Sequence, residues 1–234
     1  MTLQNAPDTR PASTGRNTLK EESARYALLR RIAPALRHHM AGTLQPIGMI
    51  SAIMERRLQA AEPDLTALRD SSKSIGTLSR SAASAGMNLI TWVVPKENGV
   101  VSLQAGVEEC VGLLATDLAF RGFTLVNNIG PSDALTSVGA LRTVFTAALI
   151  TLTDSARSPA SVVLSSEPDH DQTWVRITVN CKDGATGSDD PQSYRKLGWD
   201  DVNVLAAAEQ VRLSHGADRV EMRFSAAEHA NIPP

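Results

Sequence analysis

The feature that most constrains this fold is an apolar stripe on one long predicted helix, residues 26–58. At about 100° per residue, its apolar side chains fall within roughly 40° of one line. They are Leu29, Ile32, Leu36, Met40, Ile47, Ile50, Met54 and Leu58. On this wheel His38 points away from the stripe and His39 lies at its flank, while Pro34 and Pro46 are expected to bend the helix. A helix with one buried side and an exposed histidine suggests a group that reacts with an incoming partner.

Bulk composition excludes several classes of function. The 234-residue chain has a formal net charge of −2 and only 4% aromatic residues, which argues against a nucleic-acid-binding surface. No apolar run approaches the length of a membrane span, so we expect no membrane partner. Cys110 and Cys181 have no metal-ligand spacing, and we expect no metal site. Reduced packing cysteines and the absence of an apolar signal segment predict a cytoplasmic protein.

The first half of the chain predicts a helical hairpin. A second helix is expected over 65–91, after a helix stop and a new N-cap at Pro63 and Asp64. A lone hairpin would leave much of both apolar stripes in water. We therefore predict a homodimer in which two hairpins close a four-helix bundle. The alternative is a hairpin that packs against its own C-terminal domain.

The second half predicts an α+β sandwich with helices on one side of a mostly antiparallel sheet. Helices are expected over 103–119, 140–156 and 201–214, and strands over 123–128, 161–166, 173–181 and 219–224, with a polar loop over 184–197. The domains are then a disordered tail (1–19), the hairpin (20–94), a linker (95–99), the sandwich (100–228) and a C-terminal tail (229–234).

The segment around the paired histidines carries a family resemblance. It reads Leu36-Arg37-His38-His39-Met40-Ala41-Gly42. A hairpin with this motif, followed by such a sandwich, resembles the core of a sensor histidine kinase, with a dimerisation and histidine-phosphotransfer hairpin and an ATPase domain of the gyrase and Hsp90 type. The resemblance implies that His38 accepts the phosphoryl group, with His39 as the secondary candidate. The family usually has an acid or asparagine where His39 stands, and a neutral imidazole can serve as a base there. Arg30, Arg31 and Arg37 offer positive charge nearby.

The nucleotide-binding motifs that the resemblance implies are incomplete. Ser155, with Asp154 beside it, takes the place of the family's magnesium-binding asparagine. The adenine-recognition box matches at Asp183 and Gly187, but Ala185 replaces its middle glycine. Counted back from His215-Gly216, taken as the end of the last helix, the second glycine box falls on residues 200–204, which contain no glycine. These remnants predict a degenerate ATPase domain that has lost tight ATP binding.

The resemblance and its departures favour one function over two alternatives. The leading hypothesis is a two-component histidine phosphotransfer protein that relays a phosphoryl group between response-regulator receiver domains through His38. On this hypothesis no cofactor is expected. The first alternative is an active or divergent histidine kinase that uses Mg-ATP, and the second is a non-catalytic pseudokinase dimer that acts as a signalling adaptor.

Overall fold

The computed structural model describes residues 12–93, 99–131, 135–169, 172–186 and 195–225. Two long helices, α1 (Ala12–Leu58) and α2 (Leu65–Val93), form the predicted hairpin. Asp64 accepts hydrogen bonds from the backbone N–H groups of Thr66 and Ala67, at 2.9 and 3.0 Å, as an N-cap should. The predicted tail 1–19 is wrong over 12–19, which belong to α1, because a helix propagates easily from a packed segment. The expected linker lies almost wholly outside the described residues.

The remainder forms the predicted sandwich. Its helical elements are α3 (Leu103–Phe120), α4 (Val138–Ala140), the π-helical turn η1 (Leu141–Phe145), α5 (Thr146–Ser155) and α6 (Trp199–Ala208). Its strands are β1 (Val100–Ser102), β2 (Phe123–Asn127), β3 (Leu135–Ser137), β4 (Ser158–Asp169), β5 (Gln172–Thr186), β6 (Arg212–His215) and β7 (Arg219–Ser225). Five strands form one sheet in the order β2-β4-β5-β7-β6, parallel between β2 and β4 and antiparallel elsewhere. Strands β1 and β3 form a separate antiparallel pair.

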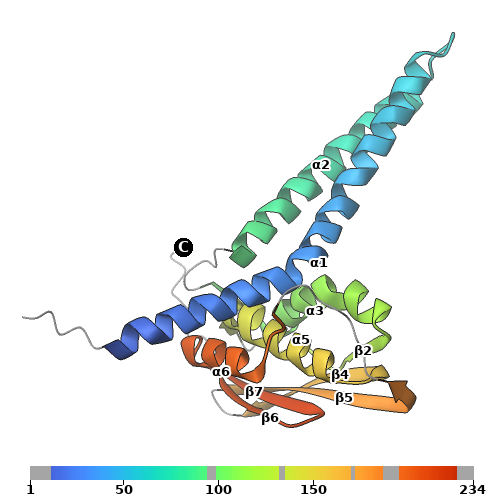
Figure 1. Cartoon of the computed structure of the whole chain (residues 1–234). Coiled ribbons are helices and arrows are strands. Elements are labelled where there is room, and N and C mark those ends of the chain that lie inside the picture. Colours follow the sequence, from blue (N-terminus) through green and yellow to red (C-terminus); the bar gives the residue numbers. More distant parts are fainter. Residues whose placement is uncertain (1–11, 94–98, 132–134, 170–171, 187–194, 226–234) are drawn as a thin grey trace, which may run out of the picture.

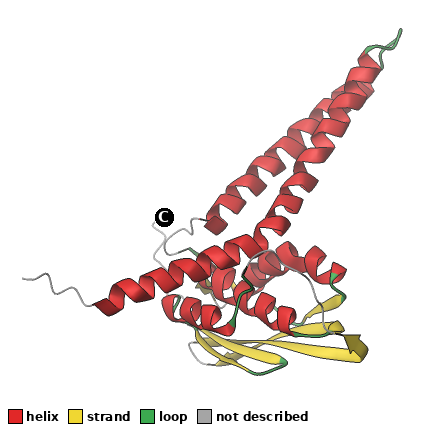
Figure 2. Cartoon of the chain, in the orientation of Figure 1, coloured by secondary structure: helices red, strands yellow, loops and turns green. Residues whose placement is uncertain are grey.

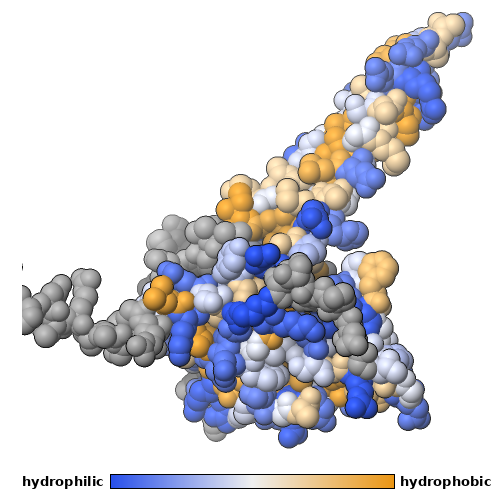
Figure 3. Space-filling view, viewed as in Figure 1, coloured by the Kyte–Doolittle hydropathy of each residue, from blue (hydrophilic) through white to orange (hydrophobic). Residues whose placement is uncertain are grey.

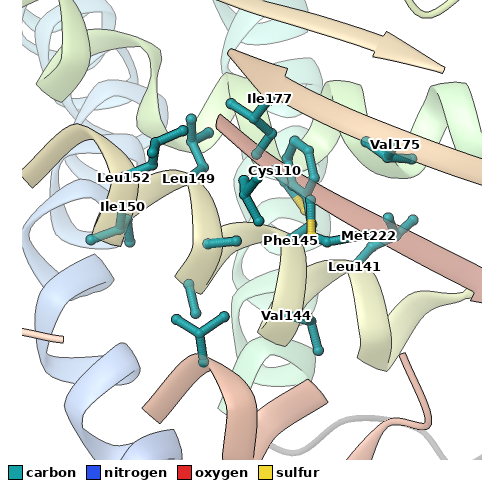
Figure 4. Close-up of a cluster of buried hydrophobic side chains, with 14 of the residues drawn as sticks. Cys110, Leu141, Val144, Phe145, Leu149, Ile150, Leu152, Val175, Ile177 and Met222 are labelled. Carbon is teal, nitrogen blue, oxygen red and sulfur yellow. The ribbon is translucent and has the colours of Figure 1, made fainter. Parts of the chain in front are cut away.

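The hydrophobic core lies between this sheet and its helices (Figure 2). Alternate residues of β5 face inward, so Val175 and Ile177 are fully buried, as the period of two predicts. They meet Phe145 and Leu149 from the helical layer, together with Cys110 of α3 (Figure 4). This core fixes the positions of α3 and α5, and both of these helices contribute to the candidate site.

The predicted helix over 201–214 is wrong beyond residue 208. Helix α6 ends at Ala208, and Gln210 has a φ of 56°, in the left-handed region that stops a helix. The chain then continues as β6, which pairs with β7 from Arg212–Arg223 to His215–Val220. Gly216 donates to the Arg219 carbonyl at 2.7 Å and closes a hairpin turn. His215-Gly216 therefore ends a strand and not a helix.

The N-terminal part of α1 lies across the helical layer of the sandwich, packed against α6 and α3 (Figure 1). Ala24, Leu28 and Ile32 are buried in this contact. The helix then changes direction and continues into the hairpin, away from the sandwich (Figure 1). Pro34 follows the last buried residue, and its missing N–H accounts for a bend. Within the described ranges, no helix is long and apolar enough to cross a membrane.

Candidate functional site

The paired histidines lie on α1 just beyond its contact with the sandwich. Both His38 and His39 are exposed. His38 is seven positions after the buried Arg31, which places the two side chains within about 20° of each other around the helix. The face of α1 that packs on the sandwich is therefore the face that presents His38, about two turns further along the helix.

His39 lines a groove between the hairpin and the sandwich. The groove has a volume of about 600 Å³ and is formed by α1, α2 and α3. Its lining includes His39, Ser84, Asn88, Glu108 and Gly112. An incoming protein surface that reached the histidines would therefore meet both the hairpin and the sandwich.

Arg142 joins the end of α2 to the sandwich and so shapes one end of this groove. Its guanidinium lies 5.4 Å from the ring centroid of Trp92 and pairs with Glu109 at 2.7 Å. It also donates to the hydroxyl of Thr91. The sequence did not single out Arg142, because its partners come from two other helices and share no local spacing with it.

At the position of the family's magnesium-binding asparagine, both Ser155 and the adjacent Asp154 have partners within the protein. Ser155 donates to the Thr151 carbonyl at 2.9 Å, which turns its hydroxyl back onto its own helix. The buried carboxylate of Asp154 accepts a hydrogen bond from Arg31 at 3.3 Å and forms an ion pair with Arg121 at 2.8 Å. Arg31 was predicted to supply positive charge near the histidine, but it points into the sandwich instead. Among the described residues, no group of acidic, histidine or cysteine side chains could hold a metal ion.

The predicted adenine-recognition box lies on an irregular part of β5. The register passes from Ala160–Cys181 to Ser158–Thr186, so residues 182–185 bulge out of the sheet. Asp183 is exposed there, and Gly184 has a φ of 80° with open space where a Cβ would stand. The bulge also leaves Cys181 exposed, although the sequence predicted a packing cysteine. Gly187 lies outside the described residues.

The predicted position of the second glycine box was counted from the end of the last helix, so it shifts when that end is corrected. Counted from the left-handed Gln210 instead of Gly216, the five-residue segment becomes 194–198 and contains one glycine, Gly198. Gly198 is the N-cap of α6, and its N–H donates to the Asp201 carboxylate at 3.0 Å. Arg195 holds the same carboxylate through two hydrogen bonds, at 2.6 and 3.0 Å. An internal anion therefore already caps the helix end that would face a phosphate.

These contacts also set the ionisation of Asp201. Burial by itself raises the pKa of this carboxyl, but the hydrogen bonds from Arg195 and the Gly198 N–H outweigh burial and lower the pKa below its ordinary value. Asp201 therefore stays ionised at neutral pH and keeps the N-terminus of α6 capped.

The chain has structural likenesses but no sequence relatives in the comparisons. No family model and no curated protein matches it. It is similar to the Acinetobacter baumannii histidine kinase AdeS, at 15% identity and a TM-score of 0.44, over 76% of this chain and 96% of that one. It is similar to a histidine kinase from Burkholderia phymatum STM815, at 13% identity and a TM-score of 0.45, over 84% and 98%. A bacterial phosphotransferase matches at 10% identity and a TM-score of 0.40, over 85% and 95%. At these identities and scores, we base the function on this chain's own residues.

Proposed function

We propose that this chain is a homodimeric histidine phosphotransfer protein of two-component signalling, and that His38 carries the phosphoryl group between receiver aspartates. The observation that carries the proposal is an exposed His38 beside a sandwich in which Asp154, next to the family's magnesium position at Ser155, is already paired with two arginines. The first provides a nucleophile that a partner protein can reach. The second means that two cations already compensate the carboxylate beside the family's magnesium position.

The transfer step needs only a neutral imidazole. An unprotonated ring nitrogen of His38 attacks the phosphorus of a receiver aspartyl phosphate, an N–P bond forms, and the P–O bond to the aspartate breaks with release of a carboxylate. The proton on the other ring nitrogen can pass to a base, and His39 is the neighbouring base near neutral pH. The reverse sequence delivers the phosphoryl group to a second receiver aspartate.

The residues present fit a magnesium nucleotide poorly, which supports transfer without ATP. Helix α5 is buried from Thr146 to Thr153, and α1 covers the helical layer above it. Asp201 already caps α6, so a phosphate there would face a carboxylate. Asp183 is exposed on a bulge instead of lying at the floor of a pocket.

The experiment is phosphotransfer from a phosphorylated receiver domain to the purified protein. We expect His38→Gln to abolish transfer with unchanged circular dichroism, because the nucleophile is lost. The matched variant His39→Gln should slow transfer by about 100-fold without abolishing it, the range of a lost general base. If His38→Gln transfers as well as the wild type, the mechanism is wrong, and loss of transfer only in His39→Gln would make His39 the acceptor.

The two alternatives have their own discriminating results. A kinase whose dissociation constant for Mg-ATP were one hundredth of the nucleotide concentration would be stabilised by about 2.7 kcal/mol, and this would give a clear thermal shift. For this protein we expect no shift. A pseudokinase adaptor would keep partner binding and signalling in the His38→Gln variant.

A further inference from the structure

Arg31 forms a buried charge cluster that joins α1 to the sandwich. Its guanidinium donates to Asp117 of α3 at 3.1 Å and to Asp154 of α5 at 3.3 Å. Arg121, the residue directly after α3, pairs with the same carboxylates, at 3.5 and 2.8 Å. We call these four residues the Arg31 cluster. Three of its members belong to the sandwich, and only Arg31 comes from the histidine-bearing helix.

The charge balance of the cluster makes α1 a necessary part of it. Without Arg31, the sandwich would hold two carboxylates against one guanidinium, and the Asp154 side chain is only 7% exposed. Asp154 Oδ2 is buried with no hydrogen-bond partner, so that carboxylate depends on its two arginines for compensation. A buried charge without its partner is costly, so the sandwich favours the state in which α1 is docked.

Apolar burial and a second ion pair extend the same contact. Ala24, Leu28 and Ile32 are buried on the sandwich, and Arg25 pairs with Glu209 at 2.8 Å, just past the end of α6. The three apolar residues recur every four positions along one side of α1. The docked surface therefore spans several helical turns, and Arg31 and Ile32 lie near its end closest to His38.

We propose that Arg31 is a positioning residue that fixes the sandwich against the histidine-bearing helix, as a built-in cation for Asp117 and Asp154. Helix α1 continues without interruption through the bend at Pro34, and His38 follows Arg31 by seven residues, about 10 Å of helix. The sandwich then keeps a fixed orientation relative to the helix that carries His38. Its role in transfer rests on the proposed function, but the docking itself does not.

Hydrogen exchange of the full-length protein tests the docking. We expect Arg31→Met to speed amide exchange of residues 19–33 by about 10-fold or more, with little change in β4, β5 and β7. The localisation follows because Arg121 still pairs with Asp154 at 2.8 Å, so the sandwich keeps one of its two cations, whereas α1 loses its ion pairs to Asp117 and Asp154. Arg56→Met is the matched control, because Arg56 is exposed on the same helix near the hairpin tip, and it should change neither region.

The results that overturn the proposal are distinct from a failure of the proposed function. Unchanged exchange over 19–33 in Arg31→Met, or equal acceleration there and in the sheet, would show that Arg31 does not hold α1 specifically. Should Arg31→Met fail to fold, Asp117→Asn must give the same localised pattern, since its carboxylate is less buried. Arg31→Lys, which keeps the charge, should restore part of the protection.

In the transfer assay Arg31→Met should lower kcat/KM by about 10-fold. A wild-type protein that transfers nothing would end the proposed function and leave the exchange result standing.

Discussion

At the scale of single residues, the two cysteines have opposite environments. Cys110 is fully buried, and desolvation raises the pKa of its thiol to about 12. Cys181 is exposed on the bulge of β5. Because the thiolate is the reactive species, only Cys181 should react quickly in the folded protein.

Thiol labelling at pH 8 therefore predicts one fast modification per chain, which Cys181→Ser should remove. The second thiol should react only after denaturation.

The raised pKa of Cys110 also has a consequence for stability. The unfolded chain loses the Cys110 proton near its ordinary pKa of 9.0 and the folded chain near 12, so stability should fall as pH rises through that window. Fast modification of both thiols in native wild-type protein would contradict the buried environment.

The residue types of the site were predictable from the sequence, but their partners were not. The exposure of His38 follows from the periodicity of one helix. The pairing of Arg31 with Asp154 joins residues 123 positions apart, and no local spacing indicates it. For this reason Arg31 was predicted to stand near the phosphoryl group, whereas it holds the sandwich.

At the scale of elements, close packing of α3 depends on one glycine. A Cβ added to Gly106 would lie 2.3 Å from Leu141 Cδ1 and 2.8 Å from Val101 Cγ1, and Leu141 is buried. Gly112 lies on the same helix with nothing within 4 Å of its added Cβ. The two glycines therefore allow the same substitution to be compared in a tight and in an open environment.

Gly106→Ala should lower the free energy of unfolding by about 1–3 kcal/mol, because the added methyl group overpacks the contact. Gly112→Ala should raise it by about 0.5–1 kcal/mol, since alanine favours a helix more than glycine does. Urea denaturation of both variants measures the difference. Equal shifts in the two variants would mean that α3 is not packed as tightly against η1 as the structure has it.

The sequence predicted elements well where their pattern is long and regular. The stripe of α1 and the alternation in β5 extend over many residues, and both elements were predicted, apart from their ends. The last predicted helix failed because Gln210, a residue that carries no strong turn signal, takes a left-handed conformation there. This error also displaced the second glycine box, since that box was counted from the helix end.

At the scale of the whole molecule, the hairpin leaves apolar surface uncovered. Within residues 37–92, only Leu68, Ser71 and Trp92 are buried. Met40 and Leu58, both members of the predicted stripe, are 40% and 53% exposed. Figure 3 shows apolar surface along the hairpin on the face in view. Such a surface is typical of a protein interface, and a second hairpin of the same pattern fits it.

A pair of charge substitutions on α1 tests this homodimer. Ile50 belongs to the stripe and is half-buried, whereas Ala52 is exposed and lies on the opposite side of the wheel. Ile50→Glu places a carboxylate from each chain in the predicted bundle interior, and burying two unpaired charges should weaken dimerisation by at least about 100-fold. Ala52→Glu adds the same charge outside the bundle and should leave the dimer intact. Light scattering after size exclusion gives both masses. A monomeric wild type, or a dimer that survives Ile50→Glu as well as Ala52→Glu, would mean that the stripe is not the dimer interface.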